Sequence, residues 1–270
     1  MDNKINYLKV KRDLIGKCNI CGDFGKLTWD HVPPKKSIFF RDIEIVSIFG
    51  KYSLEGYPKI HSQNGNKYRT ICEKCNNILG TAYDVDFIYF INQASNNVYI
   101  NFDKQEEITC KIKPVKVIKS LFGHLLAAKG DYEESLIDIK MRGYVLNKDM
   151  LLPPLNVFYW FYPFPNIDIV RDLAIAKLDN KESFDIFSMI KMYPVAFIIT
   201  ENDKFYNFKN LKDYCIDDAE CYVDIPLDIS RKNLINSDWP IIVDDNTIFL
   251  AGKSIDSSVT SSPRKIKIKK

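Results

Sequence analysis

Residues 18–21, Cys18-Asn-Ile-Cys21, and residues 72–77, Cys72-Glu-Lys-Cys75-Asn76-Asn77, form two Cys-x-x-Cys pairs on either side of Leu27-Thr-Trp-Asp30-His31-Val-Pro-Pro-Lys35. Four thiolates in two close pairs are the ligand set of a tetrahedral structural zinc ion. The pairs are separated by 50 residues, 22–71, which is much longer than the gap in a compact zinc finger. We therefore expect the chain to leave the zinc, form a β-hairpin, and return to it at the start of a helix.

Composition indicates a folded protein. The chain has 270 residues, and 46% of them are apolar, which is enough for a packed core. It has no run of 18 apolar residues, so no membrane span is expected. Its N-terminus lacks the apolar segment of a signal peptide, and its seven cysteines then favour metal binding in a reducing compartment. We expect a cytoplasmic protein.

Charge is distributed unevenly along the chain. Residues 1–95 carry 14 Lys and Arg against 10 Asp and Glu, whereas residues 96–258 carry 19 against 25. Residues 259–270 add five basic residues and no acidic one. Positive charge therefore lies in the cysteine-bearing segment and at the C-terminus, which suits a polyanionic partner such as nucleic acid. An ordinary solvated surface would explain the same distribution.

Local patterns predict the secondary structure of the first third. Residues 1–15 have the apolar spacing of a short amphipathic helix. Residues 26–32 and 68–71 are typical of strands, and the two prolines after Val32 end the first of them. A helix is expected over residues 72–90.

The rest of the chain predicts a second, strand-rich α+β domain. Residues 98–102 and 108–112 resemble a hairpin, and Pro114 begins an amphipathic helix that extends to residue 128. Further strand-like runs cover residues 157–162, 167–178, 195–200, 220–225, 241–243 and 247–250. We expect an α+β fold with domains at 1–95 and 96–258, the second binding a target or protein partner. Residues 259–270 are expected to form a disordered basic tail.

The cysteine pairs and the polar residues between them resemble a known family. Thr-x-Asp30-His31-Val-Pro-Pro-Lys and Cys72-x-x-Cys75-Asn76-Asn77 are similar to motifs of the zinc-bearing HNH endonucleases, also called ββα-metal nucleases. The similarity covers about residues 15–90, one third of the chain. It implies a treble-clef/ββα-metal nuclease domain in which Cys18, Cys21, Cys72 and Cys75 bind zinc. It also implies metal-dependent hydrolysis of phosphodiester bonds, with DNA as the expected substrate.

The resemblance assigns a role to each polar residue. His31 would be the general base that takes a proton from the attacking water, a role suited to neutral imidazole. Asp30 and Asn76 would hold one Mg²⁺ or Mn²⁺ ion, because carboxylate and amide oxygens are hard ligands. Asn76 replaces the last histidine of the family motif. A loop asparagine would orient His31; the candidates are Asn64 and Asn66, and spacing favours Asn66.

A non-catalytic zinc protein that binds nucleic acid is the alternative function. Such a module has no need for Asp30, His31 and Asn76 to converge, whereas a nuclease does. We expect His124 to be a packed or exposed residue without a catalytic role. Asp84 is expected to be a surface carboxylate or to support the site from behind. The basic residues that flank the site and could contact phosphates are Lys35, Lys36, Arg41 and Arg69.

Overall fold

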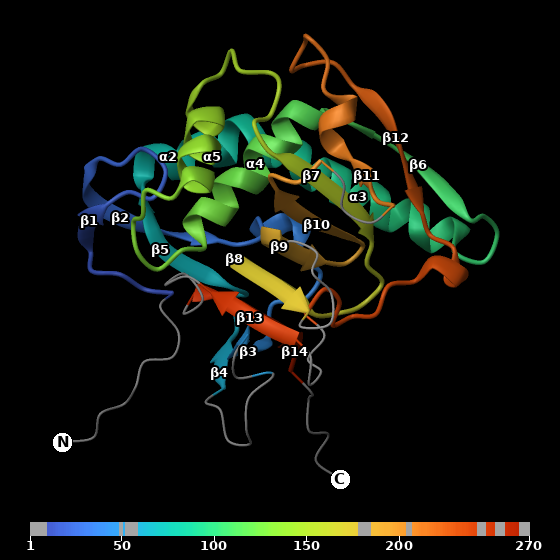
Figure 1. Ribbon diagram of the computed structural model, residues 1–270, viewed down its shortest axis with the longest axis horizontal. Helices are drawn as coiled ribbons and strands as arrows, with labels where there is room; N and C mark the ends of the chain where they lie inside the picture. Colours follow the sequence, from blue (N-terminus) through green and yellow to red (C-terminus); the bar gives the residue numbers. More distant parts are fainter. Residues whose placement is uncertain are drawn as a thin grey trace.

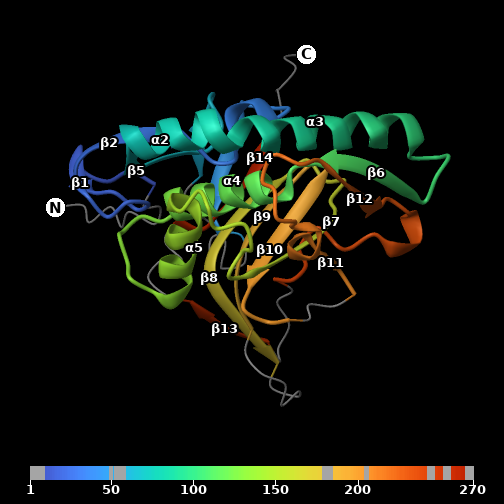
Figure 2. The same ribbon diagram turned by 90° about the horizontal axis from the view of Figure 1, so that it is seen from above.

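The described part of the computed structural model covers residues 10–48, 51, 59–177, 185–203, 207–241, 247–251 and 257–264. Within these residues the chain is mixed α+β, as predicted, and the helices cover one face of a large antiparallel sheet (Figures 1 and 2). None of the helices in these residues is long and apolar enough to cross a membrane.

A small antiparallel sheet carries the first cysteine pair and the Asp-His dipeptide. It pairs β1 (Ile15–Lys17) with β2 (Phe24–His31), and β2 with β5 (Lys67–Cys72). The strands predicted at residues 26–32 and 68–71 are thereby confirmed. The helix predicted over residues 1–15 is wrong for residues 10–15, which include the start of β1, and residues 1–9 lie outside the described part.

One helical segment follows β5 without a break. Helix α2 (Glu73–Ile78) passes through a π-helical turn, η2 (Leu79–Tyr83), into α3 (Asp84–Asn101). Buried residues recur every three or four positions along α3 as far as Val98, so the helix continues beyond residue 90. The hairpin strand expected over residues 98–102 is therefore wrong. Single π-turns inside helices are frequent at functional sites.

Within the part of the chain that the structure describes, the large sheet has nine strands. Eight of them pair in the order β11-β7-β10-β9-β8-β14-β3-β4, and β13 pairs with β8. Their bounds are β3 (Ile43–Ser47), β4 (Ile60–Ser62), β7 (Asn156–Phe161), β8 (Ile167–Lys177), β9 (Asp185–Met192), β10 (Val195–Thr200), β11 (Lys209–Asn210), β13 (Thr247–Ala251) and β14 (Val259–Pro263).

This sheet joins segments that the sequence assigned to separate units. Strands β3 and β4 come from the predicted first domain, and β14 comes from the predicted tail but pairs with both β3 and β8. The division at residue 95 is therefore wrong, because one sheet contains strands from both sides of it. The disorder predicted for residues 259–263 is also wrong, because β3 and β8 supply backbone hydrogen-bond partners on both sides of this polar segment. Residues 265–270, which hold four of the five basic residues of the tail, lie outside the described part.

Helix α4 (Pro114–Ala127) lies between α3 and the sheet (Figure 2). It confirms the predicted helix, and every residue in it except Lys116 is buried. The remaining elements are α5 (Leu136–Leu146), the paired strands β6 (Glu107–Ile112) and β12 (Val223–Asp228), and the short 3-10 helices η1 (Lys35–Ser37), η3 (Leu211–Tyr214) and η4 (Arg231–Asn233). Because α4 is enclosed, its polar side chains Lys119, Ser120 and His124 need partners inside the protein.

Candidate metal centre and the polar cluster beside it

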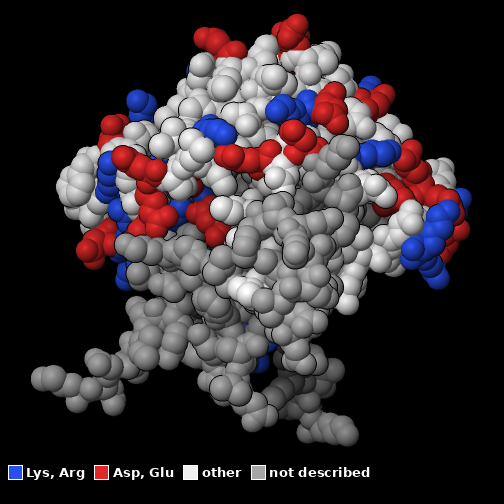
Figure 3. Space-filling model, in the orientation of Figure 1, with Lys and Arg blue, Asp and Glu red and all other residues white. Residues whose placement is uncertain are grey.

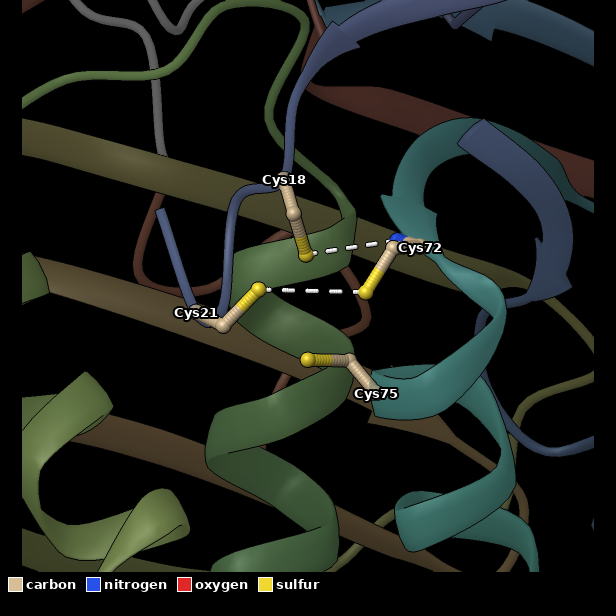
Figure 4. A group of neighbouring side chains, drawn as sticks. All are labelled: Cys18, Cys21, Cys72 and Cys75. Carbon is tan, nitrogen blue, oxygen red and sulfur yellow. Dashed lines mark hydrogen bonds between the residues drawn. The ribbon is translucent and has the colours of Figure 1, made fainter. Parts of the chain in front are cut away.

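Four cysteine thiols converge where the small sheet meets helix α2 (Figure 4). Cys18 and Cys21 lie in the turn after β1, Cys72 ends β5, and Cys75 lies in the first turn of α2. Their sulfur atoms all lie within 4.8 Å of one another, and the Sγ atoms of Cys21 and Cys72 are 3.8 Å apart. Ligands at about 2.3 Å from a tetrahedral zinc ion lie about 3.8 Å apart, so this donor set fits zinc.

The turn between the first two cysteines is shaped by backbone hydrogen bonds. The N–H of Cys18 donates to Asp23 O over 2.8 Å, and the N–H of Gly22 donates to Cys18 O over 2.9 Å. Gly22 has φ +79°, a left-handed conformation that residues with a Cβ rarely adopt. The N–H groups of Ile20 and Cys72 point at Cys18 Sγ, at 3.4 and 3.2 Å. The backbone therefore holds Cys18 ready to act as a thiolate ligand.

Cys18 and Cys75 have pKa values shifted in opposite directions because the thiols crowd together. A hydrogen bond from Cys75 lowers the pKa of Cys18 to about 5, against the effect of burial and with the help of backbone N–H groups. The bond to Cys18, burial and the neighbouring sulfurs raise the pKa of Cys75 instead. A divalent cation at the centre would remove this conflict, because it stabilises all four sulfurs as thiolates.

His31 lies at the end of β2. Its Nε2 atom is buried and has no hydrogen-bond partner among the described residues. Burial lowers the pKa of His31, as do Lys67 and Lys35, while Asp30 and a hydrogen bond with the backbone of Asn64 act in the opposite direction. The imidazole is therefore neutral at pH 7, which is the form that can accept a proton.

Asn76 ties the start of helix α2 to strand β2. Its Nδ2 atom donates to Thr28 Oγ1 over 3.1 Å and to Trp29 O over 3.0 Å. Because the amide nitrogen is used in this way, the amide oxygen is the atom left for a ligand. The structure thus brings Asn76 to the strand that carries Asp30 and His31.

Asp30 faces inward and contacts a residue that the sequence did not single out as functional. Its Oδ2 atom lies 3.0 Å from Nδ1 of His124, whose Nε2 atom lies 2.9 Å from Oδ1 of Asp84. Ser120 Oγ donates to the same Asp84 oxygen over 2.7 Å. His124 is 1% exposed. The structure therefore places His124 and Asp84 in contact with the Asp-His dipeptide, directly or through one another. We had expected His124 to be packed or exposed without a catalytic role, and Asp84 to be a surface carboxylate or to support the site from behind.

The charge of this cluster follows from its contacts. Burial opposes a charge on His124, but the carboxylates of Asp84 and Asp30 outweigh it and raise the pKa of His124 to about 10. Burial also disfavours ionisation of Asp84, yet His124 and Ser120 overcome it and lower the pKa of Asp84. Each ring nitrogen of His124 faces a carboxylate oxygen, an arrangement in which each can donate a hydrogen bond.

The Asn66 side chain, predicted to orient His31, uses one polar atom to contact β14. Asn66 is 1% exposed, and its Oδ1 atom accepts a hydrogen bond from Ser261 Oγ over 2.7 Å. Its buried Nδ2 atom has no hydrogen-bond partner among the described residues, and the backbone of Asn64 contacts His31. Asn64, the other candidate, is the asparagine beside the imidazole. Spacing could not separate the two because they are only two residues apart.

A second acidic group is already neutralised by protein cations. Carboxylate oxygens of Glu133, Asp138 and Asp172 lie close enough together to hold a metal ion. However, the Lys129 ammonium is 2.8, 2.5 and 2.7 Å from them, and Arg171 is 2.6 Å from Asp138. We therefore interpret this group as a buried ion-pair cluster.

Surface charge on the face shown in Figure 3 is mixed. Lys and Arg side chains alternate there with Asp and Glu side chains, without an extended area of one sign among the coloured residues.

Comparison of the chain with models of protein families, with curated proteins and with solved structures finds no match. The function of the protein is therefore inferred from the geometry of the site and from the motifs.

Proposed function

We propose that the protein is a metal-dependent endonuclease of the HNH type that hydrolyses phosphodiester bonds, with DNA as the expected substrate. The observation that supports this most is the buried, unpartnered Nε2 atom of His31 next to Asp30 on β2. A buried polar atom without a partner is costly in a purely structural role. It is useful where a substrate or water supplies the partner.

Two hard oxygen donors, from Asp30 and Asn76, are the candidate ligands of a catalytic cation. Among the described residues, no donor is bonded to Oδ1 of Asp30 or to Oδ1 of Asn76, whereas the other polar atom of each side chain is in use. A carboxylate and an amide oxygen suit Mg²⁺ or Mn²⁺ and not zinc. When bound, such an ion would stabilise negative charge on the phosphate and on the leaving oxygen.

The protein's own groups would then act as follows. Nε2 of His31 accepts a proton from a water molecule, whose oxygen attacks phosphorus while the bond from phosphorus to the 3′ oxygen breaks. Lys67, which pairs with His31 across the sheet, and Lys35 lie near the ring and can attract the phosphate. Both lysines also keep the imidazole unprotonated, so substrate binding and base strength depend on the same charges.

The cysteine centre has a structural task in this proposal. Cys72 and Cys75 lie on either side of the start of α2, and Asn76 follows Cys75 directly. A zinc ion held by all four thiolates would fix that turn against the turn that carries Cys18 and Cys21, and thereby against β2. The orientation of Asn76 relative to Asp30 would depend on it.

Cleavage of supercoiled plasmid in Mg²⁺ or Mn²⁺ tests the proposal. His31→Ala should lower the single-turnover rate by about 10²–10⁴-fold, the usual contribution of general acid–base catalysis. His61→Ala is the matched control, since His61 is exposed on β4 and its Nε2 atom lies 3.6 Å from a carboxylate oxygen of Glu44. Equal rates for wild type and His31→Ala would rule out the assigned base. DNA binding without any cleavage by the wild type would favour the non-catalytic binding module.

A further inference from the structure

A buried histidine connects the proposed catalytic strand to the helix that the sequence assigned to the second domain. His124 lies on α4, 94 residues from Asp30 and 40 residues from Asp84, and both ring nitrogens contact carboxylates at 3.0 and 2.9 Å. The order of contacts is Ser120, Asp84, His124 and Asp30, and all four side chains are buried or nearly so.

We propose that His124 is a positioning residue for the catalytic cation: its Nδ1–H holds Oδ2 of Asp30, so that Oδ1 of Asp30 is directed to the metal. This inference deepens the proposed nuclease function and depends on it. Histidines and carboxylates behind metal ligands commonly fix ligand orientation, and their loss weakens metal binding about 10–100-fold.

The contacts of Asp84 and Ser120 support a role of His124 in orienting Asp30. Asp84 accepts from Nε2 of His124 and from Ser120, which fixes the plane of the ring and leaves Nδ1 pointing at β2. The π-helical turn η2 ends at Tyr83 and so precedes Asp84 directly. A one-residue change in helical register at this point rotates the start of α3 relative to α2, and Asp84 is the first residue after it.

A purely structural explanation accounts less well for the same contacts. Three ionisable groups buried together lose much of their hydration, and well-packed apolar residues usually stabilise a core at least as well. Helix α4 is buried over most of its length and is mainly apolar, so a leucine at position 124 would match its other core positions.

Two isosteric variants separate the two hydrogen bonds of His124. An asparagine amide can replace Nδ1, so His124→Asn retains the bond to Asp30 and loses the bond to Asp84. A glutamine amide reaches the position of Nε2, so His124→Gln retains the bond to Asp84 and loses the bond to Asp30. Both variants remove the same charge, which makes each the control for the other.

The readout is Mn²⁺ affinity, measured by electron paramagnetic resonance of free Mn²⁺, with cleavage rate as a second readout. Mn²⁺ that is bound by wild type and lost in Asp30→Ala identifies the site. His124→Gln should bind this Mn²⁺ about 10–100-fold more weakly, whereas His124→Asn should stay close to wild type. Zinc content and the thermal midpoint should be alike in the two variants.

The outcomes distinguish failure of the inference from failure of the proposed function. Wild type that binds Mn²⁺ and cleaves, together with equal Mn²⁺ affinities for His124→Gln and His124→Asn, overturns the positioning role alone. Wild type without Asp30-dependent Mn²⁺ binding overturns the proposed function and the inference with it. If neither His124 variant folds, Asp84→Asn keeps the ring and weakens its support; about tenfold weaker Mn²⁺ binding is then expected, and unchanged affinity overturns the role.

Discussion

Removal of the last strand should unfold the protein, although the sequence of that segment resembles a disordered tail. Strand β14 pairs over residues 259–263 with β3 and over residues 259–261 with β8, so it lies inside the large sheet. Deleting residues 259–270 removes it and leaves the edges of β3 and β8 that face β14 without their backbone partners. Deleting residues 265–270 removes only the basic end of the chain and should leave the sheet intact.

The cost of the longer deletion can be worked from three side chains. Val259 is 1% exposed, Thr260 Oγ1 donates to Asp168 over 2.5 Å, and Ser261 Oγ donates to Asn66 over 2.7 Å. Burial of one valine contributes about 1.5–3 kcal/mol, and each buried acceptor that loses its donor costs about 1–3 kcal/mol. These terms reach roughly 4–9 kcal/mol before the backbone ladder is counted, and the total stability of a domain is about 5–15 kcal/mol.

Circular dichroism during thermal and urea unfolding measures the effect. The protein without residues 259–270 should lack a cooperative transition, and the protein without residues 265–270 should melt within a few degrees of wild type. A point variant, Ser261→Ala, should lower stability by about 1–3 kcal/mol, because it leaves the Asn66 oxygen without its donor. A cooperative, wild-type-like transition for the longer deletion would refute the role of β14 in the fold.

Two further predictions concern the metal centre and a buried lysine. Pure protein should contain about one zinc ion per chain, and Cys72→Ser should unfold the small sheet, since binding and folding are coupled there; a folded protein that elemental analysis finds free of zinc would contradict this. Burial lowers the pKa of Lys119 to about 8, from 10.5, although Asp149 acts against it. Between these pH values the unfolded chain binds more protons than the folded chain, so the stability contributed by Lys119 rises with pH. Urea unfolding should therefore show that the stability of wild type relative to Lys119→Met increases from about pH 7 to about pH 10. A difference in unfolding free energy that does not change with pH would contradict the lowered pKa of Lys119.

Features that depend on neighbouring residues could be predicted from the sequence alone. The cysteine pairs converge as expected, because each pair is short enough to present both sulfurs from one turn. Strands β2 and β5 and helix α4 were predicted from alternation, helical spacing and Pro114. The helix after Cys72 was also predicted, but its end was placed too early, since Val98 continues the buried stripe that follows the π-turn.

Features that join distant residues could not be predicted in this way. The pattern of residues 259–263 is polar and lacks strand-like alternation, so β14 exists only because β3 and β8 supply partners on both sides. His124 lies near the apolar face of a predicted helix, and that pattern decided neither whether the side chain is packed or exposed nor which residues it contacts. Its partners come from β2 and from the start of α3. A buried polar group must have a hydrogen-bond partner. Which residue provides it depends on which distant segments the fold brings together, and no local sequence pattern specifies that.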